Sequence, residues 1–243
     1  MPPIFLFSGA WPPLYSEGCP MIVDSHCHLD RLELTPYGGD LSRALDAARA
    51  AGVGAMLNIN IDLEHEADVR GIAEAHPDIW FSVGVHPAET EGEEPTLERL
   101  LALAAHPKCI AIGETGLDYH WCTGDTEWQR ERFRTHIRAA KATGKPLIIH
   151  TRESREDTLR ILGEENAQQV GGIMHCFTED RATAEAALAT ATETASATSS
   201  PTPSATPTTA PTPSQTSLSS VGYATSTASV GVCNKSIYVS DVT

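Results

Sequence analysis

Short apolar runs alternate with helix-like segments between residues 21 and 189, and few folds accommodate such a pattern. The six runs are rich in Val, Ile and Leu: MIVDSHCH, GAMLNINI, WFSVGVHP, CIAIGETGLD, KPLIIHTR and VGGIMHCF. Their strand ends are expected near His28, Asn60, His86, Glu114, His150 and His175, at intervals of 25 to 36 residues. That interval is the length of one strand-plus-helix unit. The alternation therefore predicts parallel strands connected by helices.

The segments between these runs carry helix signals. In residues 40–52, apolar side chains recur on one helical stripe and a glycine ends the segment. Thr96 is placed to cap the helix that follows it, and residues 126–144 form the longest candidate, again with a glycine as its stop. Ser154, with Asp157 three residues later, is expected to cap a further helix.

Two architectures fit this order, a doubly wound sheet and a (β/α)₈ barrel. No glycine-rich phosphate fingerprint follows the first run, which disfavours a dinucleotide-binding sheet. Within the runs, aliphatic residues precede the polar ones, so potential ligands are expected at the carboxyl ends of the strands. In a barrel those ends converge on one rim. A barrel would therefore gather one cluster: His26, His28, Glu114, His150 and His175.

The residue types in this cluster suit divalent metal ions. His26 and His28 are two positions apart and share a face if the segment is a strand. Neutral imidazoles bind divalent metals without adding charge, and a carboxylate can bridge two ions. Two metals about 3.5–4 Å apart can generate hydroxide near neutral pH and stabilise the attacking and leaving oxygens of a phosphoryl or acyl centre. Hydrolysis is the expected chemistry.

Three further polar residues are candidates for binding the substrate. His86 and Asp118 fit substrate-binding roles or support of the ligands. Arg152 follows His150 by two residues, where it could clamp a phosphate; the alternative is a surface ion pair with one of its neighbouring glutamates. The remaining histidines are expected to be solvated or packing residues: His65, His76, His106, His120 and His136.

The charge of the chain is unevenly distributed. The net charge is −15, yet between residues 190 and 234 the only charged side chain is Glu193. This acidity argues against a broad basic surface for nucleic acid, so a polyanionic substrate would need a local positive centre such as bound cations. Six cysteines without a C-x-x-C pair indicate reduced thiols in a cytosolic protein, with a nuclear pool as an alternative. We expect no membrane partner and assume a monomer.

Both ends of the chain differ from the central part. Residues 1–20 contain prolines and lack the basic start of a signal peptide, and we expect a disordered extension there. Residues 190–243 are rich in Thr, Ser, Ala and Pro and are expected to form a low-complexity, disordered tail. The tail is either a linker or an out-of-frame segment.

Five motifs in order resemble the TatD family of metal-dependent hydrolases: DSHCHLD, VGVHPAE, AIGETGLDYH, LIIHTRES and GIMHCFTED. The resemblance covers residues 21–189 and implies a TIM-type barrel with two divalent metal ions, commonly magnesium, with zinc or manganese as alternatives. It implies a deoxyribonuclease that cleaves phosphodiester bonds in DNA, often from 3′ to 5′. Carried over, His26 and His28 match the H-x-H ligands, Glu114 the bridging carboxylate, and His150 and His175 the ligands of the second metal.

The chain departs from the family pattern in two places. HTRES replaces a string closer to HSRDA but keeps the arginine. Family members also continue into two more strand–helix units and an ETD segment whose Asp completes the metal site, and no such segment follows residue 189. We therefore expect an α/β barrel of about six units whose catalysis is weakened. The alternatives are another amidohydrolase-type activity on an ester, lactone or amide, or a non-catalytic product.

Overall fold

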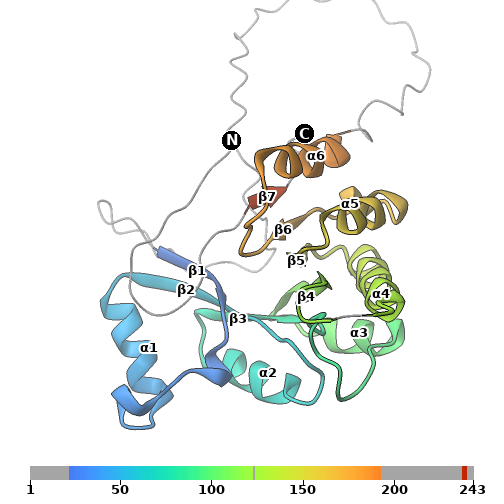
Figure 1. Cartoon of the computed structure of the whole chain (residues 1–243). Helices are drawn as coiled ribbons and strands as arrows, with labels where there is room; N and C mark the ends of the chain where they lie inside the picture. The colour runs from blue at the N-terminus through green and yellow to red at the C-terminus, as the bar shows by residue number, and fades with distance from the viewer. Residues whose placement is uncertain (1–21, 123, 193–236, 240–243) are drawn as a thin grey trace, which may run out of the picture.

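The parallel strands form a curled half-barrel. The computed structural model describes residues 22–122, 124–192 and 237–239. Strands β1 to β6 lie side by side in chain order, each parallel to the next, and β7 pairs antiparallel with β6 (Figure 1). The strands are β1 (Ile22–Cys27), β2 (Val53–Asn58), β3 (Ile79–Val83), β4 (Cys109–Asp118), β5 (Leu147–Arg152), β6 (Gly172–Met174) and β7 (Ile237–Val239).

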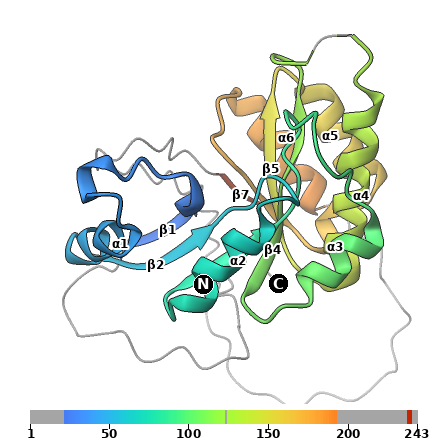
Figure 2. The same ribbon diagram turned by 90° about the horizontal axis from the view of Figure 1, so that it is seen from below.

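One α-helix follows each of the six parallel strands. These helices are α1 (Leu41–Ala50), α2 (Glu66–Ala75), α3 (Leu97–Ala104), α4 (Glu127–Thr143), α5 (Arg155–Glu164) and α6 (Arg181–Thr192). They surround the strands on the outside of the curl, as the two views in Figures 1 and 2 show. A doubly wound sheet reverses its strand order at a switch point. The unbroken order β1 to β6 therefore excludes that alternative and confirms an incomplete barrel of six units.

The helix starts and ends that the sequence predicts are found in the structure, with one exception in the capping hydrogen bonds. The Thr96 side chain accepts a hydrogen bond from the amide of Arg99, 3.1 Å away, and Gly144 ends α4 in the left-handed conformation. Ser154 is the N-cap residue of α5, as expected, but its side chain makes no capping hydrogen bond. Its hydroxyl instead donates to the carbonyl of Leu117, 2.9 Å away, because the residue is buried against the end of β4.

The core lies between the strands and the helices that cover them. Phe81 on β3 and Phe133 on α4 are completely buried, and they are the two largest such side chains among the described residues. Strand β4 is buried over almost its whole length. Central parallel strands are covered on both faces, which explains why the first four residues of β4, residues 109–112, are all apolar.

Strand β4 is longer than the sequence indicated. It continues to Asp118, so Glu114 lies inside the strand and not at its end. Two glycines permit this, because a Cβ on Gly113 would come within 2.5 Å of the Ile148 carbonyl oxygen and one on Gly116 within 2.0 Å of the His150 carbonyl oxygen. The close approach of β4 to β5 therefore depends on the absence of side chains on both sides of Glu114.

The expectations for the chain ends and the cysteines have different outcomes. The proposed extension (1–20) lies outside the described residues, as does most of the proposed tail (190–243). Cys27, Cys109 and Cys122 are free thiols, but Cys176 is disulfide-bonded, which corrects the expectation that every thiol is reduced. Within the described ranges, no helix combines the length and the apolar character needed to cross a bilayer.

Candidate metal centre

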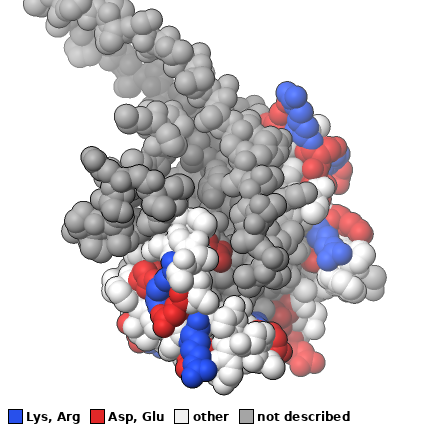
Figure 3. Space-filling view, turned by 90° about the vertical axis from the view of Figure 1, so that its left-hand side faces the viewer, with Lys and Arg blue, Asp and Glu red and all other residues white. Residues whose placement is uncertain are grey.

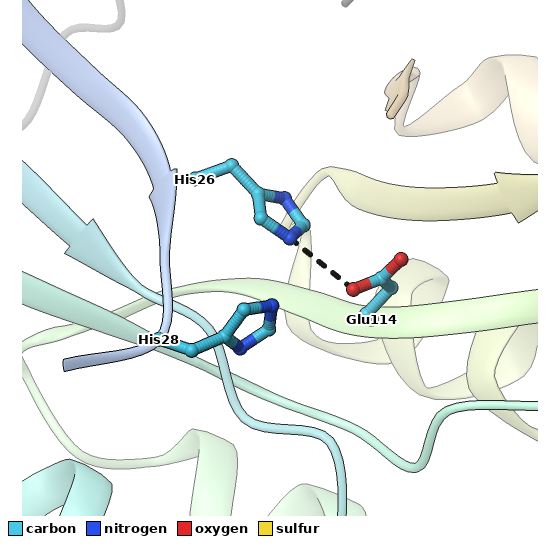
Figure 4. A group of neighbouring side chains, drawn as sticks. All are labelled: His26, His28 and Glu114. Carbon is cyan, nitrogen blue, oxygen red and sulfur yellow. Dashed lines mark ion pairs between the residues drawn. The ribbon is translucent and has the colours of Figure 1, made fainter. Parts of the chain in front are cut away.

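The side chain of Glu114 is surrounded by imidazole rings from neighbouring strands. Its Oε2 lies 3.2 Å from Nε2 of His26, on β1 (Figure 4). Its Oε1 lies 3.2 Å from Nδ1 of His150, on β5. Nε2 of His86, in the loop after β3, is 3.7 Å from the same Oε1. Glu114 is only 3% exposed. A buried carboxylate of this kind needs positive partners.

Potential metal-donor atoms form two groups that share this carboxylate. The first consists of His26, His28 and Glu114, and the second of His86, Glu114 and His150. Within each group, the donor atoms all lie within 4.8 Å of one another. Figure 4 shows the two imidazoles of the first group turned toward Glu114. Each carboxylate oxygen of Glu114 therefore faces a different group.

Hydrogen bonds fix the orientation of two of these rings. His28 Nδ1 lies 3.0 Å from the carbonyl oxygen of Ile59, to which it donates, and this leaves Nε2 without a proton. His150 Nε2 lies 2.9 Å from Oδ2 of Asp118, which leaves Nδ1 to face Glu114. A histidine whose second nitrogen is held by an oxygen is the usual arrangement for a metal ligand.

His86 is oriented in the opposite sense. Its Nδ1 accepts a hydrogen bond from the amide of Ala88, 3.1 Å away. A neutral imidazole that accepts at Nδ1 carries its proton on Nε2. That nitrogen points to the space beside Glu114 and lies 3.2 Å from Nδ1 of His150. His86 is thus a hydrogen-bond donor into the centre, although it belongs to one of the two groups by distance.

His175 is packed against the first group. Its ring stacks on that of His26, with centroids 3.3 Å apart and an interplanar angle of 7°. Nδ1 of His175 is buried and has no hydrogen-bond partner among the described residues, and the only polar contact of the buried Nε2 of His26 is the 3.2 Å ion pair with Glu114. Buried nitrogens without partners are costly, and a cation would satisfy them. The residues present therefore fit a divalent metal.

The pKa values follow from burial and from the central carboxylate. Burial lowers the pKa of His28, lowers that of His86 to about 4 and, together with His26, lowers that of His175 to about 3. These rings are neutral near pH 7, which is the form that binds metals. Burial opposes ionisation of Glu114, but its contacts with His150 and His26 outweigh this and hold its pKa well below the usual value.

Asp118 and Arg152 lie on the side of the centre formed by β4 and β5, where they are register partners. Asp118 is buried and holds His150, and its Oδ1 accepts hydrogen bonds from the amides of His120 and Trp121, both 3.0 Å away. Arg152 is exposed and lies over the ring of Trp121. Ion pairs of Arg152 with its neighbouring glutamates are not seen within the described part of the chain. Those glutamates pair with other residues.

Helix α4 contributes a polar stripe that the sequence analysis missed. Gln129, Arg132 and His136 recur at helical spacing among apolar residues and are all buried. The amide group of Gln129 donates to the carbonyl oxygens of Pro87 and Asp118, both 3.1 Å away, and accepts from the amide of Asp118 at 3.0 Å. The sequence did contain a signal for this stripe, because these polar residues recur at helical spacing on the face of α4 that is otherwise apolar.

The other two members of the stripe hold the loop that carries His86. Arg132 donates to the carbonyl oxygens of His86 and Glu89, at 3.2 and 2.6 Å. His136 Nε2 accepts from the amide of Val85, and its Nδ1 donates to the carbonyl oxygen of Arg132, 2.8 Å away. The expectation that His136 packs is met, but its ring also fixes the backbone beside His86.

The face of the molecule in Figure 3 shows no broad basic area among the described residues. On the side of the molecule shown in Figure 3, Lys and Arg side chains are interspersed with Asp and Glu, and the coloured residues form no continuous basic area. The composition agrees, with 32 acidic against 17 basic side chains. Binding of a polyanion would therefore depend on the centre itself and on the few cations beside it.

Comparison with known proteins places the chain in a family. The family model described as TatD related DNase matches residues 23–205. The uncharacterized metal-dependent hydrolase YcfH of Escherichia coli (strain K12) is 40% identical over 163 residues, which are 67% of this chain and 61% of the relative. A protein of Erwinia tasmaniensis named 3′-5′ ssDNA/RNA exonuclease TatD is 33% identical over 162 residues, 65% of this chain and 62% of the relative.

Solved structures show the same fold. The TatD homologue YjjV of Escherichia coli K12 has a TM-score of 0.59 at 29% identity, over 68% of this chain and 63% of that one. A TatD family hydrolase of Entamoeba histolytica has a TM-score of 0.60 at 23% identity, over 70% and 62% of the two chains. The chain spans less than two thirds of the length of each of these proteins.

Proposed function

Since the chain belongs to the TatD related DNase family, we propose that it hydrolyses phosphodiester bonds in DNA with the help of divalent metal ions. The observation that carries this proposal is the position of Glu114, whose Oε2 faces His26 and whose Oε1 faces His150. A carboxylate shared in this way suits a two-metal site, and such sites serve phosphoryl transfer in nucleases and phosphatases. The exonuclease name of the Erwinia tasmaniensis relative supports a nucleic-acid substrate.

The residues that would hold the metal are those whose free nitrogens face Glu114. We assign His26, His28 and Glu114 to one ion and Glu114 with His150 to the other. The free nitrogen of His175, stacked on His26, makes it a further ligand of the same centre. When bound, the ions would lower the pKa of water and offset negative charge on the phosphate.

The other residues act on the substrate or on the ligands. His86 donates from Nε2 into the space beside Glu114, where a phosphate oxygen would accept. Asp118 holds His150 in the tautomer that leaves Nδ1 free, and Arg152 offers a positive charge at the exposed side of the centre. His86 carries a proton on the nitrogen that faces the centre, whereas the neighbouring ligands present nitrogens without a proton. We therefore assign His86 to the substrate and those ligands to the metal.

The identity of the metal is part of the proposal. The family resemblance implies magnesium, whereas a donor set dominated by imidazole nitrogen matches manganese or zinc better than magnesium, which prefers oxygen ligands. A screen of Mg²⁺, Mn²⁺ and Zn²⁺ added to chelator-treated protein distinguishes them. The ion that restores activity at the lowest concentration is the functional one.

The test measures hydrolysis of bis(p-nitrophenyl) phosphate and of end-labelled single-stranded DNA. We expect metal-dependent cleavage of both, abolished by EDTA and reduced at least about 100-fold by Glu114→Gln. Glu98→Gln, an exposed carboxylate on α3, is the matched control and should leave the rate unchanged. Cleavage that survives EDTA, or a Glu114→Gln variant as active as the control, would refute the proposal.

A second chemistry is compatible with the same donor set, because the ligands do not by themselves select phosphorus over carbon. The strongly acidic composition, which disfavours a polyanionic substrate, is the observation in its favour. A parallel assay with p-nitrophenyl acetate and simple lactones addresses it. Turnover of these compounds without turnover of phosphodiesters would replace the nuclease with a carboxylic ester or lactone hydrolase. Metal binding without turnover of either class would indicate a non-catalytic product.

A further inference from the structure

An exposed tryptophan stands beside the candidate metal centre. Trp121, in the loop after β4, is 67% exposed, more than any other large hydrophobic side chain in the described ranges. Exposing an indole forgoes much of the free energy that its burial would contribute. A large aromatic side chain left in solvent next to a polar centre is therefore a candidate for ligand contact.

The backbone of Trp121 is tied to the centre through a single carboxylate. Its amide donates to Oδ1 of Asp118, 3.0 Å away, and Oδ2 of the same residue lies 2.9 Å from Nε2 of His150. His150 in turn lies 3.2 Å from Glu114. Three consecutive polar contacts thus connect the tryptophan backbone with the proposed bridging carboxylate, so the loop that carries the indole is held beside the candidate centre.

A cation and a second ring accompany the indole. The guanidinium carbon of Arg152 lies 5.4 Å from the centroid of the Trp121 ring, and the ring of His120 meets it edge-on at 4.7 Å. Nδ1 of His120 lies 2.8 Å from Oε1 of Glu153, which holds that ring in place. Arg152 follows the proposed ligand His150 by two residues along β5.

This combination has the chemistry of a single-stranded nucleic-acid subsite. Proteins bind single strands by stacking bases on aromatic side chains and by placing cations near the phosphates. A paired duplex keeps its base faces stacked, so an indole reaches them at an unpaired end or in a single strand. We propose that Trp121 and Arg152 bind the nucleotide next to the scissile phosphodiester, with its base on the indole and its phosphate at the guanidinium.

This inference rests on the proposed nuclease function, and it predicts which substrates depend on Trp121. Stacking of one base is worth about 5- to 150-fold in binding. Trp121→Ala should raise the KM for decathymidine by a factor in that range, with little change in kcat. Trp121→Phe, which keeps an aromatic face, should restore most of the affinity.

Two controls separate stacking from a structural effect. Trp128→Phe alters another partly exposed tryptophan that lies over an arginine, on α4, and should not change the KM. An oligonucleotide with an abasic site at the terminal position removes the proposed partner, so wild type and Trp121→Ala should bind it equally. An equal loss on the normal and the abasic strand would overturn the inference, as would a Trp121→Ala variant with an unchanged KM.

Binding measured without turnover keeps this inference distinct from the nuclease proposal. Fluorescence anisotropy of labelled decathymidine in EDTA reports affinity when no cleavage occurs. Weaker binding by Trp121→Ala, together with a wild type that cleaves no phosphodiester under any metal, would support the subsite and refute the nuclease. Cleavage by the wild type, combined with DNA binding that does not change in Trp121→Ala, would refute the subsite alone.

Discussion

The ring of His136 accepts a hydrogen bond at Nε2 from the main-chain amide of Val85, and the two nitrogens are 3.0 Å apart. Both residues are fully or almost fully buried. Val85 directly precedes His86, the histidine that donates into the candidate centre. Helix α4, on the outside of the half-barrel, therefore takes part in placing a group at the carboxyl ends of the strands.

Removing this ring should destabilise the protein. His136→Ala leaves the buried amide of Val85 without a partner, which costs about 1–3 kcal/mol before the effect of the cavity is added. We expect the free energy of unfolding in urea to fall by at least that amount. His65→Ala, whose side chain is more than half exposed, is the control and should change stability by less than about 1 kcal/mol. Equal effects of the two substitutions would contradict the role assigned to His136.

The same residue makes stability depend on pH. Burial lowers the pKa of His136 in the folded protein to about 4, compared with 6.5 for an ordinary histidine. Between these values the unfolded chain binds a proton that the folded one does not, so stability is fully present above pH 6.5 and falls as the pH drops toward 4. A single histidine contributes at most about 1.4 kcal/mol per pH unit in this window.

Replacing His136 with Gln should remove this part of the pH dependence. The glutamine can still accept from Val85 but does not titrate. Thermal melting at pH 7 and pH 5 should therefore show a smaller loss of Tm for His136→Gln than for the wild type. Some dependence should remain, since His86 and His175 are also held neutral by burial. An unchanged loss of Tm would contradict the assignment.

Asp118 should control metal affinity through His150. In the wild type, the contact of Asp118 with His150 Nε2 fixes the imidazole tautomer whose Nδ1 is free to bind metal. Asp118→Asn weakens this contact. Loss of such a supporting carboxylate commonly lowers metal affinity by about 10- to 100-fold. Calorimetric titration with Mn²⁺ measures the change, and the exposed Asp68→Asn on α2 is the control. If both variants bind Mn²⁺ like the wild type, Asp118 does not support the centre.

Two glycine substitutions should have opposite effects. A Cβ on Gly116 would come within 2.0 Å of the carbonyl oxygen of His150, and its φ of +133° is unfavourable for other residues. Gly116→Ala should therefore cost at least about 2 kcal/mol of stability. Gly71, inside α2, has open space around it and no positive φ, so Gly71→Ala should stabilise by up to about 1 kcal/mol. Chemical denaturation of both variants tests the assignment.

The sequence predicts the repeating architecture well because strand and helix periodicity are local. It also indicates which imidazoles and which carboxylate lie near the carboxyl ends of the strands. It places Glu114 at a strand end, however, whereas β4 continues to Asp118. This continuation depends on the close approach of Gly113 and Gly116 to β5, whose residues are distant in the sequence. The direction of donation by His86 depends on the conformation of its loop, and residue spacing does not contain that information.

The polar stripe on α4 escaped prediction for a related reason. The spacing of Gln129 and His136 shows only that they share one face of helix α4. Their hydrogen-bond partners lie in the loop after β3 and become known only from the position of the helix against that loop. The different use of Ser154 has the same origin, since the carbonyl of Leu117 becomes available only when β4 extends beyond Glu114. Long-range contacts decided each of these cases.

The number of Mn²⁺ ions bound per chain, determined by calorimetry for the wild type and for Glu114→Gln, tests whether Glu114 holds two ions. Glu114 faces both groups of donor atoms, so we expect two ions per wild-type chain and weakened binding of both in the variant. Wild-type protein that binds no Mn²⁺, or a variant that binds it with the same stoichiometry and affinity, would contradict the claim that Glu114 unites the imidazoles into one metal centre.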